Sequence, residues 1–228
     1  MEYGTHRRQF NSFPALTALF VAIITLFLAQ PSVATEETDT SQTKYVLALG
    51  DSLTAGYLLG PDESFPVQLE AHLNANGENV RVINAGVSGD TTKSGLSRLD
   101  WALGDIPNGT PDVVVLELGA NDAMRGIEPA AVRQNLSAII EHLQKTGANI
   151  LLAGMLAPPN MGPAYAAEFD PLYEALATKY GLTLYPFFLE GVATHTELTL
   201  EDGKHPTAEG VSIIVTRIAP LVTKLLME

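Results

Sequence analysis

A serine follows an acid at the end of a short apolar run, in the stretch VLALGDSLTAGY at residues 46–57. A serine hydroxyl becomes a nucleophile when an adjacent base takes its proton. His205, in DGKHPT, is the candidate base, because Asp202 lies three residues before it. At that spacing the carboxylate can accept from Nδ1 while Nε2 points at the serine. The residue types therefore predict acyl transfer, with Ser52 as nucleophile, His205 as general base and Asp202 as the acid that orients the imidazole.

Simpler interpretations of the same residues stay open. Ser52 could merely cap a helix, and His205 could precede a helix beside a solvated acid. The other histidines of the chain lie in settings that favour the base role less: an N-terminal segment (His6), amphipathic helical patterns (His72, His142) and a loop (His195). Acids and histidines also crowd together between residues 195 and 205, but no ligand spacing such as H-E-x-x-H appears. We therefore expect no metal.

Acyl chemistry also needs hydrogen-bond donors for the oxyanion that forms during attack. Gly89, in GVSGDT, has no side chain to shield its backbone N–H, and Asn121, in GAND, offers a carboxamide. With the N–H of Ser52 these make three candidate donors. Taken alone, Gly89 and Asn121 could each be an ordinary turn residue. Asp51 is expected to order the serine turn through an Asx-type hydrogen bond.

Elements that alternate along the chain must bring these residues together. Amphipathic helical patterns, such as residues 129–147 and the stretch after Thr207, separate short apolar runs. The runs are YVLAL, VRVIN, DVVVLEL, NILLAG and LTLYPF. This pattern predicts a three-layer α/β/α sandwich with a five-stranded parallel sheet. Ligands bind beyond the carboxyl ends of such strands, which is where the candidate residues fall.

Composition and motifs exclude several other functions. GDSLTAG lacks the G-x-G-x-x-G spacing, no Walker lysine follows, and the serine is not in a G-x-S-x-G elbow. The formal net charge is −13 and no basic stripe exists, so nucleic acid is not an expected partner. The chain has no cysteine, so its stability must come from a hydrophobic core.

The first residues resemble an export signal. A cationic start precedes an apolar run at residues 15–29, a proline and the small residues SVA. That run is short for a bilayer span, although an uncleaved anchor is the alternative. We expect a signal peptide at 1–34, a polar leader at 35–43 and one hydrolase domain at 44–228, exported to the periplasm or secreted.

The combination GDSLTAGY, GVSGDTT, GAND and DGKHP resembles the four blocks of the GDSL/SGNH hydrolases, in the family's order and over nearly the whole body. Within that family the sequence is most similar to bacterial exported arylesterases and thioesterase/lysophospholipases. The resemblance implies a flavodoxin-like fold without metal or organic cofactor. It also implies a Ser52–His205–Asp202 triad and an oxyanion hole formed by Ser52, Gly89 and Asn121.

The expected substrates are aryl esters with short to medium acyl chains, and also lysophospholipids or acyl thioesters. Side chains after two strands should line the substrate groove: Met124, Ile127, Pro159, Met161 and Tyr165. Arg125 could meet a charged headgroup or simply be exposed. A small-molecule or lipid ester is the expected partner, with no stable membrane insertion after signal removal, and a monomer or weak oligomer is expected. The alternatives are an acetyl esterase or acyltransferase acting on exported glycans, and a catalytically silent binding protein.

Overall fold

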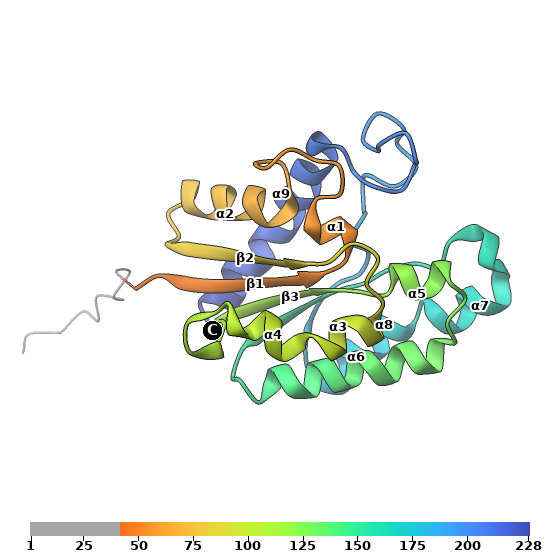
Figure 1. The fold of residues 1–228 in the computed structure, drawn as a ribbon, viewed down its shortest axis with the longest axis horizontal. Coiled ribbons are helices and arrows are strands. Elements are labelled where there is room, and N and C mark those ends of the chain that lie inside the picture. The colour runs from red at the N-terminus through yellow and green to blue at the C-terminus, as the bar shows by residue number, and fades with distance from the viewer. Residues whose placement is uncertain (1–41) are drawn as a thin grey trace, which may run out of the picture. The chain divides into compact units, whose positions relative to one another are not determined.

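The structure is a computed structural model that describes residues 42–228, so the expected signal and most of the polar leader lie outside the described residues. Five parallel strands form one sheet in the order β2-β1-β3-β4-β5 (Figure 1). In chain order they are Lys44–Gly50 (β1), Val80–Gly86 (β2), Val113–Glu117 (β3), Asn149–Ala153 (β4) and Thr183–Tyr185 (β5). All five predicted strands are therefore confirmed, and the order is that of flavodoxin-like sheets.

Helices cover both faces of this sheet, which confirms the three-layer sandwich (Figure 1). On one face lie α1 (Ser52–Ala55), α2 (Phe65–Ala75) and α9 (Ala208–Leu226). On the other lie α3 (Thr92–Ser97), α4 (Leu99–Gly104), α6 (Pro129–Gln144) and α8 (Leu172–Tyr180). Two further helices, α5 (Ala120–Met124) and α7 (Gly162–Phe169), lie near the edge where the strands end, and two 3₁₀ turns span Pro107–Gly109 (η1) and Pro159–Met161 (η2).

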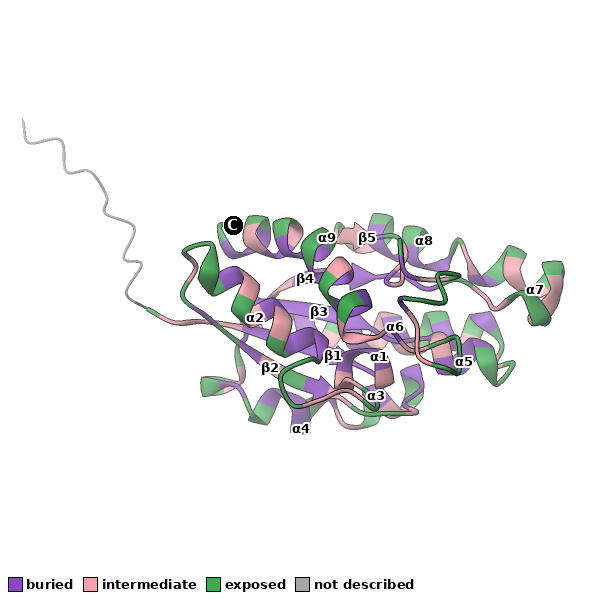
Figure 2. Cartoon of the chain, turned by 90° about the horizontal axis from the view of Figure 1, so that it is seen from above, coloured by how far each residue is buried: buried purple, intermediate pink, exposed green. Residues whose placement is uncertain are grey.

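The hydrophobic core lies between the sheet and these helices. Every residue of β3 is buried, as are the last five residues of β1 (Figure 2). Parallel strands covered on both faces need such continuous apolar runs. Within residues 42–228, no helix is both long enough and apolar enough to cross a bilayer.

The helix boundaries follow local chemistry. Thr207 caps α9, because its side chain accepts from the backbone N–H of Gly210, as the sequence suggests. The helical pattern at 129–147 extends three residues past α6, and Gly147, with a φ of +83°, closes the turns that follow the helix. The helix ends at Gln144, and Lys145 and Thr146 then donate to carbonyls only three residues back. Tightened bonds of this kind commonly complete a helix C-terminus.

Two glycines let the serine turn fold against the sheet. A Cβ at Gly50 would lie 2.0 Å from the hydroxyl of Thr54, and one at Gly86 would lie 2.3 Å from the backbone nitrogen of Ala55. Gly50 and Gly86 are paired in the β1–β2 register. Glycine at both strand ends therefore permits the close approach of α1 that positions Ser52 at the sheet edge.

Candidate active site

Ser52 is the first residue of α1, and Asp51 is the residue that caps this helix. The Asp51 carboxylate accepts from the backbone N–H of Leu53 at 3.0 Å, which confirms the expected Asx-type bond. The interpretation of Ser52 as the helix cap is therefore wrong. Its hydroxyl instead contacts the imidazole of His205, with 2.8 Å between Oγ and Nε2.

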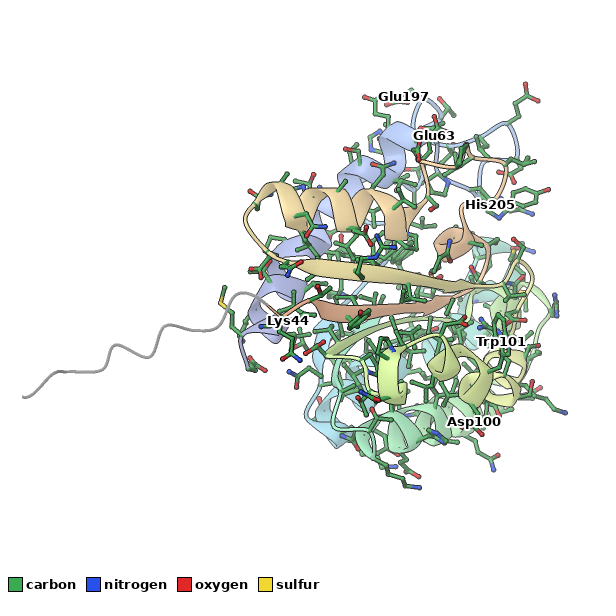
Figure 3. All side chains as sticks on the ribbon, turned by 60° about the vertical axis from the view of Figure 1, so that its left-hand side comes forward. Lys44, Glu63, Asp100, Trp101, Glu197 and His205 are labelled. Carbon is green, nitrogen blue, oxygen red and sulfur yellow. The ribbon has the colours of Figure 1, made fainter. Side chains whose placement is uncertain are left out.

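His205 is held on its other side by Asp202. The distance from Nδ1 to Oδ2 of Asp202 is 2.5 Å, and the second carboxylate oxygen accepts from the backbone N–H groups of Lys204 and His205. This loop is anchored by an antiparallel bridge between Thr199 and Pro206. In Figure 3, His205 lies at the end of the sheet opposite Lys44, the first residue of β1. The structure thus brings the three predicted triad residues into one chain of hydrogen bonds.

The environment of Asp202 keeps its carboxylate ionised. Desolvation alone would raise the pKa of Asp202, but the hydrogen bonds from the His205 ring and from two backbone N–H groups lower that pKa to about 2. An ionised acid can only accept hydrogen bonds. The imidazole must therefore donate from Nδ1, which leaves Nε2 as the acceptor that faces Ser52.

The two further oxyanion candidates follow β2 and β3, the strands on either side of β1. Asn121, in α5, is buried, and its Nδ2 donates to the Asp51 carboxylate at 2.9 Å. Gly89 has a φ of +85°, which glycine adopts without strain. Among the hydrogen bonds of the described residues, none uses the N–H of Gly89. Among the bonds of residues 42–228, the N–H of Gly89 and the second N–H of the Asn121 carboxamide are therefore left to donate to a ligand.

A buried carboxyl group that the sequence interpretation missed lies behind this turn. Glu117, at the end of β3, is completely buried, and its Oε2 accepts from the hydroxyl of Thr54 at 2.8 Å and from the backbone N–H of Asp51 at 3.3 Å. Burial raises the pKa of Glu117 well above its usual value. Burial likewise raises the pKa of Asp51, to about 6, against the hydrogen bonds from Leu53 and Asn121. Burial therefore favours the neutral form of Glu117 behind the serine turn.

The predicted groove residues divide into two neighbouring groups. Met124 is exposed at the end of α5, whereas the carbonyl of Ile127 accepts from the hydroxyl of Tyr165 at 2.7 Å. The Met161 methyl group lies near Gly126, and Pro159 is exposed at the start of η2. The segments after β3 and β4 therefore contact each other. Within the described part of the chain, no hydrogen bond or ring contact joins these five side chains to Ser52 or His205.

Tyr57, which the sequence does not single out as a site residue, contacts the predicted base His205. The ring of Tyr57 lies against that of His205, with centroids 4.5 Å apart. Other exposed apolar side chains follow the ends of β1 to β4, and they are Leu58, Val87, Met124 and Leu156. The signal that could have found Tyr57 is its position in the serine block, one short turn after the nucleophile.

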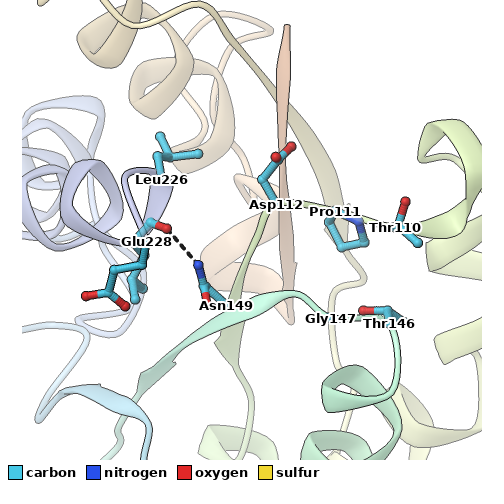
Figure 4. Close-up of a pocket in the computed structure, with 9 residues that line it drawn as sticks. Thr110, Pro111, Asp112, Thr146, Gly147, Asn149, Leu226 and Glu228 are labelled. Carbon is cyan, nitrogen blue, oxygen red and sulfur yellow. Dashed lines mark hydrogen bonds between the residues drawn. The ribbon is translucent and has the colours of Figure 1, made fainter. Parts of the chain in front are cut away.

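A hollow of about 400 Å³ lies at the opposite end of the sheet, where Asp112 directly precedes β3 and Asn149 begins β4 (Figure 4). The Asn149 side chain donates there to the carbonyl of Leu225. None of the candidate site residues lines this hollow. Over residues 42–228, no group of three or more His, Cys, Asp or Glu side chains is arranged to hold a metal ion.

The parallel sheet and the polar site at its carboxyl edge are those of an α/β ester hydrolase. Residues 48–213 match the model of the GDSL-like lipase/acylhydrolase family. The chain belongs to this family, as the four sequence blocks predict, and it is a carboxylic ester hydrolase.

Individual relatives agree with this assignment. The chain is 41% identical to an arylesterase of Vibrio mimicus over 78% of this chain and 88% of the relative. It is 34% identical to thioesterase 1/protease 1/lysophospholipase L1 of Escherichia coli, over 76% and 81% of the two chains. The crystal structure of AlinE4, an SGNH-hydrolase family esterase, is similar with a TM-score of 0.68 and 50% identity, over 80% of this chain and 96% of that one.

Proposed function

We propose that this ester hydrolase uses Ser52 as nucleophile, His205 as general base and Asp202 as the residue that orients the imidazole. The observation that carries the proposal is the continuous hydrogen-bond chain, with 2.8 Å between Ser52 and His205 and 2.5 Å between His205 and Asp202. The low pKa of Asp202 supports it, since an ionised acid stabilises the imidazolium that forms during attack. The oxyanion donors are the N–H of Ser52, the N–H of Gly89 and the Asn121 carboxamide.

The reaction proceeds in two stages. Ser52 Oγ attacks the acyl carbon while His205 Nε2 takes its proton, and the tetrahedral oxyanion is bound by the three donors. The alcohol leaves with the proton from His205, which gives an acyl-serine. Water then attacks this acyl-serine with the same proton transfers, and the carboxylic acid leaves as Ser52 regains its proton. Each step is supplied by side chains and backbone groups of this chain.

The substrates we propose are aryl esters with short to medium acyl chains, together with lysophospholipids or acyl thioesters. The similarity to an arylesterase and to a thioesterase/lysophospholipase supports these classes. The exposed apolar side chains Tyr57, Val87 and Met124 at the carboxyl edge suit an apolar acyl or aryl group. Initial rates on p-nitrophenyl esters from acetyl to palmitoyl test this proposal. We expect a maximum at short to medium chains, and a preference for palmitoyl would contradict it.

We also propose that the protein is exported and works in the periplasm or outside the cell as a monomer or weak oligomer. The expected signal at 1–34 and polar leader at 35–43 motivate this, with the catalytic domain at 44–228. The net charge of −13 argues against nucleic acid and anionic lipid surfaces as partners. Cell fractionation of the full chain, with the intact mass of the exported form, tests the export. Retention in the cytoplasm at full mass would contradict it.

A further inference from the structure

The turn that carries Gly89 is connected directly to the strand that precedes Ser52. Val87 donates its N–H to the carbonyl of Gly50 at 3.1 Å, and Asp90 donates back to the carbonyl of Val87 at 3.0 Å. These bonds close a tight turn around residues 87–90. Within it, Gly89 has a φ of +85°, and its N–H makes no hydrogen bond to any of residues 42–228. Gly89 can rotate at low cost because it has no Cβ.

Arg98 contacts this turn from the side of α3. Its Nε lies 2.5 Å from Oδ2 of Asp90, and its terminal nitrogen donates to the carbonyl of Gly50 at 3.0 Å. The side chains of Arg98 and Asp90 are only 15% and 11% exposed. A partly buried ion pair with good geometry is a strong constraint. Arg98 therefore joins the end of β1, one residue before Asp51, to the residue that follows Gly89.

Arg125 contacts the same turn from the side of α5. Its guanidinium donates to the carbonyl of Gly89 at 2.8 Å, while the rest of the side chain is exposed. The preceding helix α5 also contains Asn121, so this contact connects two of the proposed oxyanion donors. The two dihedral angles of Gly89, φ and ψ, link the peptide that carries its N–H to the peptide whose carbonyl Arg125 binds. Fixing that carbonyl therefore restricts the direction of the N–H.

We propose that Arg98 and Arg125 are positioning residues that together hold the N–H of Gly89 in the oxyanion hole. The inference rests on the proposed function of Gly89. It gives Arg125 a role other than binding a charged headgroup. Because an oxyanion donor acts only when charge develops, loosening the turn lowers kcat and leaves KM nearly unchanged.

Kinetics of Arg125→Met on an uncharged p-nitrophenyl ester test this inference, with Arg81→Met as the matched control. Arg81 is also exposed, but it pairs with Glu70 on another part of the surface. We expect kcat of Arg125→Met to fall about tenfold, the size of one lost hydrogen bond to a charged group and less than the loss of a whole donor. Arg125→Lys, which keeps one donor and the charge, should recover part of the loss.

Affinity for a trifluoromethyl ketone provides the second readout, because its tetrahedral adduct carries an oxyanion that the substrate lacks. The affinity of Arg125→Met for this inhibitor should weaken by the same factor by which its kcat falls. Arg98→Met should lose more, and thermal melting shows whether that variant is folded. Equal kcat and inhibitor affinity in Arg125→Met and Arg81→Met, or a change in KM alone, would overturn the inference. An inactive wild type would instead contradict the proposed function itself.

Discussion

The phenol ring of Tyr57 lies against the imidazole of His205, with ring centroids 4.5 Å apart and an angle of 39° between their planes. The backbone N–H of Tyr57 donates to the carbonyl of Ser52 at 3.1 Å. One short turn therefore supplies both the proposed nucleophile and an aromatic surface for its base. This contact limits how far the imidazole can rotate away from Ser52.

Removing the Tyr57 ring should lower the turnover rate. Aromatic contacts contribute about 0.5–1.5 kcal/mol, so we expect Tyr57→Ala to lower kcat by about two- to tenfold. Tyr57→Phe keeps the ring and should behave as wild type. Val67→Ala, which removes another exposed apolar side chain on α2, is the control. If Tyr57→Phe were as slow as Tyr57→Ala, the hydroxyl rather than the ring contact would matter.

The Asn121 carboxamide should matter in the transition state. Loss of one oxyanion donor costs on the order of 10²–10³ in kcat, and we expect Asn121→Ala to fall in this range with little change in KM. Asn76→Ala, at an exposed position after α2, is the control. Steady-state kinetics on a p-nitrophenyl ester give kcat and KM for both variants. A variant with raised KM and unchanged kcat would mean that Asn121 only binds substrate.

Asp202→Asn should lose both activity and stability. Without the acid that fixes the His205 tautomer, we expect kcat to fall on the order of 10³–10⁴. The pKa of Asp202 is lowered from its ordinary value of 3.8 to about 2. The ionised carboxylate therefore stabilises the folded state fully at pH values above 3.8, and this stabilisation is lost as the pH falls through about 2. The stability gap between wild type and variant should therefore close in strong acid. Thermal melts of wild type and Asp202→Asn across acidic pH measure this difference, and Glu201→Gln, at an exposed neighbouring position, is the control. A difference in melting temperature that persists in strong acid would contradict the prediction.

Glu117→Gln should flatten the pH dependence of stability. Because burial raises the pKa of Glu117, wild type is stabilised by the protonated acid and loses that stability as the pH rises above the ordinary value of 4.5. A glutamine cannot ionise, so the melting temperature of the variant should decline less than that of wild type as the pH rises above 4.5. Part of the decline should remain, since Asp51 has a pKa of about 6. The exposed variant Glu174→Gln is the reference. Parallel curves of melting temperature against pH for Glu117→Gln and wild type would contradict the raised pKa of Glu117.

The sequence predicts the fold well because local signals agree with the tertiary structure. The strands are apolar runs bounded by glycine or polar residues, and the capping threonine before α9 is readable from residue type alone. Parallel strands place their carboxyl ends at one edge, so the predicted site residues come from the order of the blocks.

The supporting contacts could not be predicted in the same way, because they depend on which distant segments meet. Glu117 lies within an apolar run and gives no sign of facing Thr54 until the register of β1 and β3 is known. Arg98 and Arg125 are typical surface residues by type, and only the closed turn at residues 87–90 shows what they hold. Tyr57 belongs to the serine block, but its partner His205 lies 148 residues further along the chain, in the loop before the last helix.

The most direct measurement of the central claim is covalent labelling by a fluorophosphonate, followed by mapping of the modified peptide. Phosphonylation requires an activated serine beside its base. We expect wild type to be labelled on Ser52, Ser52→Ala to remain unlabelled, and His205→Ala to react slower by on the order of 10²–10⁴. Failure of the wild type to react, or labelling of Ser52→Ala at the wild-type rate, would contradict the account.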